Sequence, residues 1–587
     1  MSILTDLLTE QLKEAFAAAG YDASYGAVRV SDRPDLCEFQ CNGAMAGAKQ
    51  YRKAPLAIAG EVAEQCGRLK DAAFTAEAVR PGFLNLNVKP ECLPPLLAGM
   101  AADEKLGIKA EGAGIKAVID YGGPNVAKPL HVGHLRAAVI GESIKRICRE
   151  AGCEVLGDVH LGDWGLQMGL IITELKERQP ELPYFDENAS EFPSDPPFTI
   201  SELEEIYPAA SARSKEDEAY RERALEATSE LQAGRPGYIA LWKHILSVSV
   251  ADLKRNYERL DVHFDLWKAE SDVQPYIPGI VERMKSTGIA RLDDGALVVD
   301  VTRPEDKKEI PPCIVLKSDG ASLYSTTDIA TIYERMKLFS PDRIIYVVDK
   351  RQAMHFEQVF RTVRKAGIAG EETELIHVGF GTMNGKDGKP FKTREGGVMR
   401  LESLLNEIES DMTVKISGNK NVRAEDAEST AKTVALAALK YGDLSNQASK
   451  DYVFDVEKFS SFEGNTGPYI LYTIVRIKSI LEKAAESSPA DGGRILPPAS
   501  PEEKTMMLDL LEFGSVFKEA YRELAPHRIC AYIYRLSNDF NRFYHATRIL
   551  SEEDEGRRNS YLGLLLLTRR VLEKSISLLG FSAPDHM

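Results

Sequence analysis

The sequence has few cysteines, a shortage of positive charge and no long apolar run, and each shortage excludes a class of protein. Its eight cysteines are spread along 587 residues with no two in C-x-x-C spacing, which argues against a zinc ribbon and a disulfide framework. No run of about 18 uninterrupted apolar residues occurs, so we expect no membrane span. With 89 acidic and 73 basic side chains, the chain is not a uniformly basic nucleic-acid coat, although a local basic surface can bind RNA on an acidic body.

Two common phosphate-binding motifs are also missing. There is no G-x-x-x-x-G-K-[ST] and no G-x-G-x-x-G after the first strand of the predicted sheet, which argues against the P-loop and dinucleotide-binding classes. The composition, 44% hydrophobic and 28% charged, is typical of soluble globular proteins. The length predicts roughly three to four domains. We expect a reduced, cytoplasmic and monomeric enzyme.

Changes in the hydrophobic pattern divide the chain into an α+β unit, a parallel-sheet domain with a helical insertion, a connecting region and an all-α unit. The first unit mixes helical patterns with short alternating strands. The second opens with strand, loop, helix and strand, which indicates a Rossmann-type parallel α/β sheet. The expected bounds are 1–112 for the α+β unit, 113–402 for the sheet domain, about 176–260 for its insertion, 403–462 for the connection and 463–587 for the all-α unit.

The sharpest feature lies in the first loop of the predicted sheet, where His131 and His134 stand three residues apart at the start of a helix. Free backbone N–H groups and the helix dipole make such an end an anion site. Two imidazoles add donors for triphosphate oxygens, and Gly133 lets phosphate approach the backbone closely. Two other interpretations remain: capping histidines, or a zinc pair, which lacks a third ligand nearby and an H-E-x-x-H pattern.

A second candidate lies at 385–397, a glycine-rich stretch with four basic side chains against two acidic ones. A basic loop can stabilise negative charge that develops only in a transition state. The alternative is a solvated hairpin turn. The basic residues are Lys386, Lys389, Lys392 and Arg394.

These segments resemble class I aminoacyl-tRNA synthetases, and arginyl-tRNA synthetases in particular. The run from His131 to His134 is similar to the HIGH signature of that class, and PNVAKPLHVGHLR and HLGDWGLQMG resemble the arginyl enzymes. The basic loop resembles the KMSKS loop in a Phe-Lys-Thr-Arg form, which departs from KMSKS at Phe391 and Thr393. The sequence leaves open whether Lys392 or Arg394 takes the role of the second lysine of KMSKS.

The resemblance implies the residues that bind ATP and the amino acid. A guanidinium is planar and permanently charged, so its pocket needs carboxylates in fork geometry with aromatic or amide walls. The sequence predicts a hairpin turned at Asp319–Gly320 and a helix from near Thr326, which places Asp328 in the first turn, where an acid is otherwise only a dipole complement. The residues implied for catalysis are His131, His134, Lys392 and Arg394; those for ATP are Pro124, Asn125, Lys128, His131, Gly133, His134 and Lys392; those for arginine are Asp120, Asn125, Glu270, Tyr324, Asp328 and Gln352.

The C-terminal part carries a candidate RNA surface. Residues 531–550 interleave aromatic side chains with arginines, and aromatic platforms beside arginines grip unstacked bases. The alternative is a helix with an aromatic core face and a basic solvent face. The resemblance implies an anticodon-binding bundle here and a tRNA D-loop contact in the N-terminal unit. The implied tRNA contacts are Arg535, Arg542 and Tyr544 in the bundle, and Phe83 and Asn85 in the N-terminal unit.

The resemblance as a whole implies a ligase of protein biosynthesis that activates L-arginine with ATP and Mg²⁺ and transfers it to the 3′ end of tRNA-Arg. No protein-bound structural metal is expected. Two alternatives stay open: another class I synthetase, such as a cysteinyl enzyme with a zinc site, and a catalytically inactive RNA-binding relative. The scattered cysteines disfavour the first, and the intact histidine pair and basic loop disfavour the second.

Overall fold

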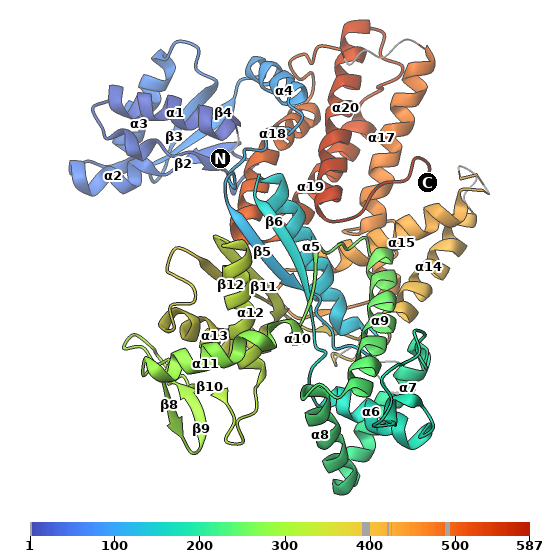
Figure 1. The fold of residues 1–587 in the computed structure, drawn as a ribbon. Coiled ribbons are helices and arrows are strands. Elements are labelled where there is room, and N and C mark those ends of the chain that lie inside the picture. Colours follow the sequence, from blue (N-terminus) through green and yellow to red (C-terminus); the bar gives the residue numbers. More distant parts are fainter. Residues whose placement is uncertain (1–2, 390–398, 419–421, 424, 488–492) are drawn as a thin grey trace.

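The structure is a computed structural model that describes residues 3–389, 399–418, 422–423, 425–487 and 493–587 (Figure 1). Its N-terminal unit is a four-stranded antiparallel sheet in the order β1-β2-β4-β3, covered by helices. Leu4, Leu8 and Leu12 of α1 are fully buried, because a spacing of four places them on one face of the helix. The elements are α1 Ile3–Ala18, β1 Arg29–Val30, β2 Phe39–Cys41, α2 Gly43–Tyr51, α3 Pro55–Arg68, β3 Phe74–Val79, β4 Phe83–Val88 and α4 Leu93–Ala102.

The centre of the molecule is a five-stranded parallel sheet in the order β12-β11-β5-β6-β7, which confirms the predicted Rossmann-type fold. The chain leaves β5 toward β6 and β7 and later returns on the other side through β11 and β12. The strand order therefore reverses between β5 and β11, and open sheets of this kind bind ligands at the carboxyl ends of such strands. The elements are β5 Lys116–Tyr121, α5 Val132–Glu150, β6 Glu154–Leu161, β7 Leu266–Ala269, α12 Tyr324–Phe339, β11 Arg343–Asp349, α13 Ala353–Lys365 and β12 Glu374–Phe380.

Two excursions leave this sheet. The first, between β6 and β7, is helical as predicted and lies away from the C-terminal bundle in Figure 1. The second, between β7 and α12, contains a three-stranded antiparallel sheet in the order β10-β9-β8. The elements are α6 Leu166–Arg178, α7 Ile200–Glu216, α8 Glu218–Gln232 and α9 Pro236–Arg259 in the first, and α10 Glu270–Val273, α11 Ile277–Ser286, β8 Ala290–Asp293, β9 Ala296–Val299 and β10 Cys313–Leu316 in the second.

The predicted hairpin at Asp319–Gly320 is wrong. Hydrogen bonds from Gly320 N to Lys317 O (2.9 Å) and from Lys317 N back to Ala321 O (3.0 Å) close a turn, but no strand follows it. The helix α12 begins at Tyr324, two residues earlier than predicted. Asp328 therefore lies in the second turn of α12, where the helix dipole stabilises a negative charge only weakly.

The C-terminal part is a helical bundle that is bonded to the central domain. Ser143 Oγ of α5 donates to Leu578 O at 2.9 Å, and Arg146 Nη1 donates to Ser577 O at 3.0 Å. These bonds join α5 to the end of the last helix, where the Ser577 carbonyl also accepts a hydrogen bond from Gly580 N at 3.1 Å. Among the described helices, none combines the length and apolarity that a bilayer crossing requires. The remaining elements are β13 Met383–Asn384, α14 Leu401–Ser417, α15 Ala427–Leu444, β14 Tyr452–Val453, α16 Val456–Phe459, α17 Gly467–Ser487, α18 Pro501–Glu523, α19 Pro526–Ala546 and α20 Glu555–Leu578.

Candidate functional site

The two predicted histidines form the amino-terminal cap of α5. His131 Nδ1 accepts a hydrogen bond from Gly133 N at 3.0 Å, and His134 Nδ1 accepts one from His131 N at 3.2 Å. The two ring centroids lie 3.9 Å apart. Because each Nδ1 is an acceptor, the neutral ring carries its proton on Nε2, which remains available as a donor. Capping and phosphate binding are therefore compatible, since each uses a different nitrogen.

Both histidines are held in the neutral form. Burial, together with the nearby His131 and Lys128, lowers the pKa of His134 to about 3. Burial and then Lys128 also lower the pKa of His131. A Cβ on Gly133 would lie 2.7 Å from His131 Cε1, so the glycine is needed to seat the His131 ring. The turn therefore offers two neutral N–H donors whose bonds strengthen as negative charge accumulates on a phosphate.

The chain that follows the basic loop is anchored beside these histidines. Val132 N donates a hydrogen bond to Met399 O at 3.0 Å. Lys392 and Arg394 lie outside the described residues, so their predicted roles stay predictions. Met399, which follows this loop, is hydrogen-bonded to the histidine turn through Val132.

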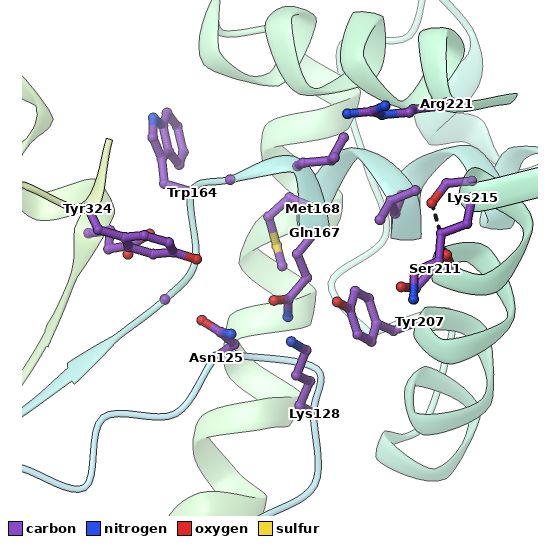
Figure 2. Close-up of a pocket in the computed structure, with 16 residues that line it drawn as sticks. Asn125, Lys128, Trp164, Gln167, Met168, Tyr207, Ser211, Lys215, Arg221 and Tyr324 are labelled. Carbon is purple, nitrogen blue, oxygen red and sulfur yellow. Dashed lines mark hydrogen bonds between the residues drawn. The ribbon is translucent and has the colours of Figure 1, made fainter. Parts of the chain in front are cut away.

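A pocket of about 630 Å³ opens at the carboxyl ends of β5, β6 and β7. It brings together Asn125, Lys128, Glu270 and Tyr324, four of the predicted substrate residues that lie as much as 199 positions apart. Figure 2 shows Asn125 and Lys128 on one side of the cavity and Tyr324 on another. Tyr324 is 69% exposed, so its ring is free to contact a ligand.

Asn125 is held in place by the neighbouring strand end. Val126 N donates to Gly162 O at 3.0 Å, and Gly162 N donates to Pro124 O at 3.2 Å. A Cβ on Gly162 would lie 2.0 Å from Asn125 Oδ1, so only glycine leaves room for the Asn125 side chain. Pro124 is buried and contributes to this loop through its carbonyl.

Glu270 is the carboxyl group of the pocket. Burial, together with the negative charges of Asp163 and Asp328, raises its pKa to about 7. Asp163 is in turn fixed by Ser271, whose N and Oγ donate to it at 2.9 and 2.6 Å. A cation placed among these acids would favour the ionised form of Glu270. The acids around Glu270 therefore favour a positively charged ligand beside them.

Asp328 lies within reach of these acids but has a partner of its own. Its Oδ2 is 2.5 Å from Nε2 of His355 in α13. Gln352 caps the start of α13, one turn before His355, and is exposed. Gln352 is not among the residues that line the pocket, so its predicted contact with arginine stays a prediction.

Asp120 is occupied by an internal arginine. Arg335 Nη2 lies 2.5 Å from Asp120 Oδ2 and 2.6 Å from Asp158 Oδ2. The Arg335 side chain is 2% exposed, against 13% for Asp120. Nε and Nη1 of Arg335 are buried without a hydrogen-bond partner in the described structure. The predicted contact of Asp120 with substrate stays a prediction; in the described structure its carboxylate pairs with Arg335.

Most aromatic side chains of the predicted RNA helix α19 belong to the core. Tyr532, Phe540 and Phe543 are at most 2% exposed, as the alternative interpretation of this helix held. Arg535 pairs with Asp509 at 3.1 Å and also with Glu512.

Other predicted RNA contacts differ in how accessible they are. Arg542 is well exposed and pairs with Asp539 in its own helix. Tyr544 is half-buried, and the guanidinium of Arg476 lies 5.2 Å from its ring centroid. Asn85 is only 7% exposed and accepts a hydrogen bond from Gln40. Of the two residues predicted in β4, Phe83 is therefore the more accessible.

Sequence reasoning missed several residues of the site. Asp163 and Trp164 lie in the string HLGDWGLQMG but were not singled out. His355 and Arg335 carry no local signal, because their partners are distant in the chain; Arg335 and Asp120 are 215 positions apart. Such pairs become visible only in the folded molecule.

Comparison with known families assigns this architecture to a class. Residues 97–456 match the family described as tRNA synthetases class I (R), catalytic domain. Residues 470–587 match the DALR anticodon binding domain, and residues 2–88 match the arginyl tRNA synthetase N terminal domain. Together with the parallel sheet and the capping histidines, these matches define a class I aminoacyl-tRNA synthetase.

Individual relatives narrow the class to one family. The chain is 60% identical over 603 residues to the arginine–tRNA ligase of Agathobacter rectalis and 54% identical over 590 residues to that of Alkaliphilus oremlandii, covering each in full. Arginyl-tRNA synthetase structures from Plasmodium falciparum (TM-score 0.79, 23% identity) and Thermus thermophilus (TM-score 0.78, 24% identity) share its fold over the full length of both chains. The chain belongs to the arginyl-tRNA synthetase family.

Proposed function

We propose that this protein activates L-arginine with ATP to arginyl-adenylate and transfers the arginyl group to the 3′ end of tRNA-Arg, releasing AMP and pyrophosphate. The observation that carries this choice of amino acid is the group of acids around Glu270, whose pKa is raised to about 7 by burial and by Asp163 and Asp328. A guanidinium stays protonated at any physiological pH and would compensate these charges. A neutral amino acid would leave them uncompensated.

The activation step needs little proton chemistry. The carboxylate oxygen of arginine attacks the α-phosphorus of ATP, and the bond from that phosphorus to pyrophosphate breaks. This carboxylate is already ionised at neutral pH, so no protein base is required. The Nε2–H groups of His131 and His134 are the neutral donors for the phosphate oxygens, and ATP enters as its Mg²⁺ complex, which offsets the charge of the leaving pyrophosphate. We assign Lys392 and Arg394 to the same leaving group.

The other regions serve the tRNA in this proposal. The bundle at 463–587 binds the anticodon end, the unit at 1–112 contacts the D-loop, and residues 403–462 connect the bundle to the catalytic domain at 113–402. The DALR and N-terminal family matches support these assignments. We further propose that a single subunit is sufficient and that it acts in the cytoplasm.

The test is tRNA charging together with ATP–pyrophosphate exchange, each measured with several amino acids and the exchange also without tRNA. Arginine alone is expected to give product, and preferential charging of another amino acid would overturn the proposal. Asp328→Asn keeps the shape but removes the charge. It should raise the KM for arginine on the order of 10- to 100-fold, because a hydrogen bond to a charged group contributes about 1.5–3 kcal/mol, and leave the KM for ATP nearly unchanged. An unchanged arginine KM would make Asp328 only a structural partner of His355.

A further inference from the structure

Two cysteines meet at the carboxyl end of α5, and neither has a role in the function proposed above. Cys153 N donates a hydrogen bond to Cys148 O at 3.0 Å. Gly152 N donates to Arg149 O at 2.9 Å, and Gly152 has a φ of +94°. These two bonds across a left-handed glycine form the Schellman motif, which commonly brings the side chains at its two ends into contact. The ends here are Cys148 and Cys153, and their thiols are hydrogen-bond partners.

The two thiols differ in how readily they ionise. The bond with Cys148 lowers the pKa of Cys153. The Tyr521 hydroxyl, 3.4 Å from Cys153 Sγ, and the guanidinium of Arg343 lower this pKa as well, against the opposing effect of burial. Arg343 lies 5.8 Å from the Tyr521 ring centroid and also pairs with Glu374 at 2.6 Å. The bond with Cys153 and burial raise the pKa of Cys148. Cys153 is therefore the nucleophile of the pair, because a thiolate reacts and a thiol does not.

Other cysteines of the chain lack these partners. Cys41 and Cys66 are at most 3% exposed, and burial raises the pKa of Cys41 to about 11 and that of Cys66 to about 12. Cys92 is the one cysteine that is not buried, yet burial of its sulfur and the charge of Glu91 raise its pKa too. Neither burial nor exposure therefore explains the lowered pKa of Cys153, which comes from the groups around its sulfur.

We propose that Cys148 and Cys153 form a redox site that hydroperoxides oxidise to a disulfide. The Cys153 sulfur attacks one peroxide oxygen, so that an S–O bond forms, the O–O bond breaks and the leaving hydroxide takes up a proton to become water. The Cys148 sulfur then attacks the Cys153 sulfur. The S–O bond breaks, and the hydroxide leaves with the proton of Cys148 as a second water. The two thiols lose two electrons, which the peroxide gains, and a dithiol reductant reverses the reaction by exchange.

The oxidation state of this pair affects a junction between domains. Cys153 precedes β6 of the central sheet, whereas Tyr521 belongs to α18 of the bundle. Glu111 pairs with Lys518 and, at 3.3 Å, with Arg522 on the same helix. A disulfide leaves the Cys153 sulfur without the negative charge that accepts the hydrogen bond from Tyr521. Oxidation therefore weakens one of the contacts that join the catalytic domain to α18.

The experiment treats the full-length protein with hydrogen peroxide at neutral pH, alkylates the remaining thiols and identifies the modified peptides by mass spectrometry. The wild type should lose two hydrogens between Cys148 and Cys153, and a dithiol reductant should restore both thiols. Cys148→Ser should stop at a sulfenic acid on Cys153, which a cyclic 1,3-dione captures, whereas Cys153→Ser should leave Cys148 unmodified. Tyr521→Phe should slow the oxidation on the order of threefold, because a higher pKa leaves less thiolate but makes it more nucleophilic.

Cys41 and Cys66 are the matched buried cysteines, and Cys92 is the control for exposure. All three should stay reduced at the dose that converts half of the Cys148–Cys153 pair. Oxidation of Cys92 before this pair would overturn the proposal, because access would then decide which thiol reacts. Absence of the link between Cys148 and Cys153 in the wild type would overturn it as well, and this result does not depend on how the variants fold. No arginine, ATP or tRNA enters the assay, so its outcome is independent of the function proposed above.

Discussion

At the scale of single residues, each histidine of the α5 cap divides its two ring nitrogens between two tasks. Nδ1 accepts the backbone N–H that orders the cap, and Nε2 is left to donate. Donation to phosphate matters most when negative charge builds up on the oxygens around phosphorus. We therefore expect these rings to stabilise the transition state more than bound ATP.

His134→Ala should accordingly lower the rate of adenylate formation on the order of 100-fold, with little change in the KM for ATP. The measurement is ATP–pyrophosphate exchange at saturating ATP. Because the pKa of His134 is about 3, this ring should contribute nothing to the pH profile near neutrality. The variant's thermal unfolding must be compared with that of the wild type, since the same ring caps α5. Normal turnover in the variant would contradict the phosphate role.

Glu270 gives the free protein a titration near neutral pH, because its pKa is about 7. A bound guanidinium would favour the ionised form and lower this pKa, so arginine binding should release a proton and weaken as the pH falls below about 7. The KM for arginine, measured on both sides of this value, should therefore rise toward acid in the wild type. Glu270→Gln should have a higher KM that no longer depends on pH. A wild-type KM that is flat with pH would exclude this titration.

The same shift has a consequence for stability. An unperturbed glutamate ionises near 4.5, whereas Glu270 holds its proton to about 7 in the folded protein. Between these values the folded state binds more protons than the unfolded chain. The stability that Glu270 contributes is therefore fully present below about 4.5 and is lost as the pH rises through about 7.

At the scale of elements, Arg335 holds a helix to two strands. Its guanidinium in α12 bonds Asp120 at the end of β5 and Asp158 in β6, at 2.5 and 2.6 Å. Buried carboxylates are stable only when they are paired. This single side chain therefore pairs with both acids and fixes the strand ends from which the site is built.

Arg335→Met should lower the free energy of unfolding by roughly 3–5 kcal/mol, because it leaves the buried Asp158 and the partly buried Asp120 without a cation. Adding Asp120→Asn and Asp158→Asn should recover part of this loss. Urea unfolding followed by tryptophan fluorescence is suitable, since Trp164, Trp242 and Trp267 are the three tryptophans of the chain and all lie in this domain. Arg291→Met is the control: its pair with Asp293 is exposed and should matter by less than about 1 kcal/mol. Equal losses in the two variants would remove the special role of Arg335.

At the scale of the whole molecule, an acidic protein has to bind a polyanion. The chain carries a net charge of −16, so long-range attraction to tRNA is weak or opposed and binding depends on local patches. The bonds from Ser143 and Arg146 of α5 to the end of α20 join the helix that carries the histidine turn to the bundle. One tRNA therefore has to meet both regions at a set separation.

For the bundle, we predict that Arg542→Ala weakens tRNA binding and makes the salt slope shallower by about one unit, because one phosphate contact is lost. Tyr544→Ala should weaken binding by roughly 1–3 kcal/mol with little change in slope, since stacking releases no counterions. Affinities for amino acid and ATP measured without tRNA should not change. Arg528→Ala is the control within α19, because Arg528 pairs with both Glu519 and Glu523 and its side chain is 39% exposed, against 64% for Arg542. If Arg542→Ala and Tyr544→Ala both bind tRNA as the wild type does, the exposed face of α19 takes no part in binding.

Short-range features of this protein could be predicted from its sequence alone. The sequence predicts strand, loop, helix and strand at the start of the sheet domain, and β5, the loop with the histidine pair, α5 and β6 follow in that order. Capping by the histidine pair was one of the interpretations that the sequence left open. All of these depend on side-chain periodicity, caps and turn residues that act within one or two turns of chain.

Only the tertiary structure decided which distant side chains meet. It placed Arg335 on Asp120 and His355 on Asp328, directed Lys215 and Arg221 of the insertion into the pocket, and turned most aromatic rings of α19 into the core. A helical period shows that one face is apolar but not what covers it. An ion pair likewise depends on the packing of elements far apart in the chain, and no local pattern records that packing.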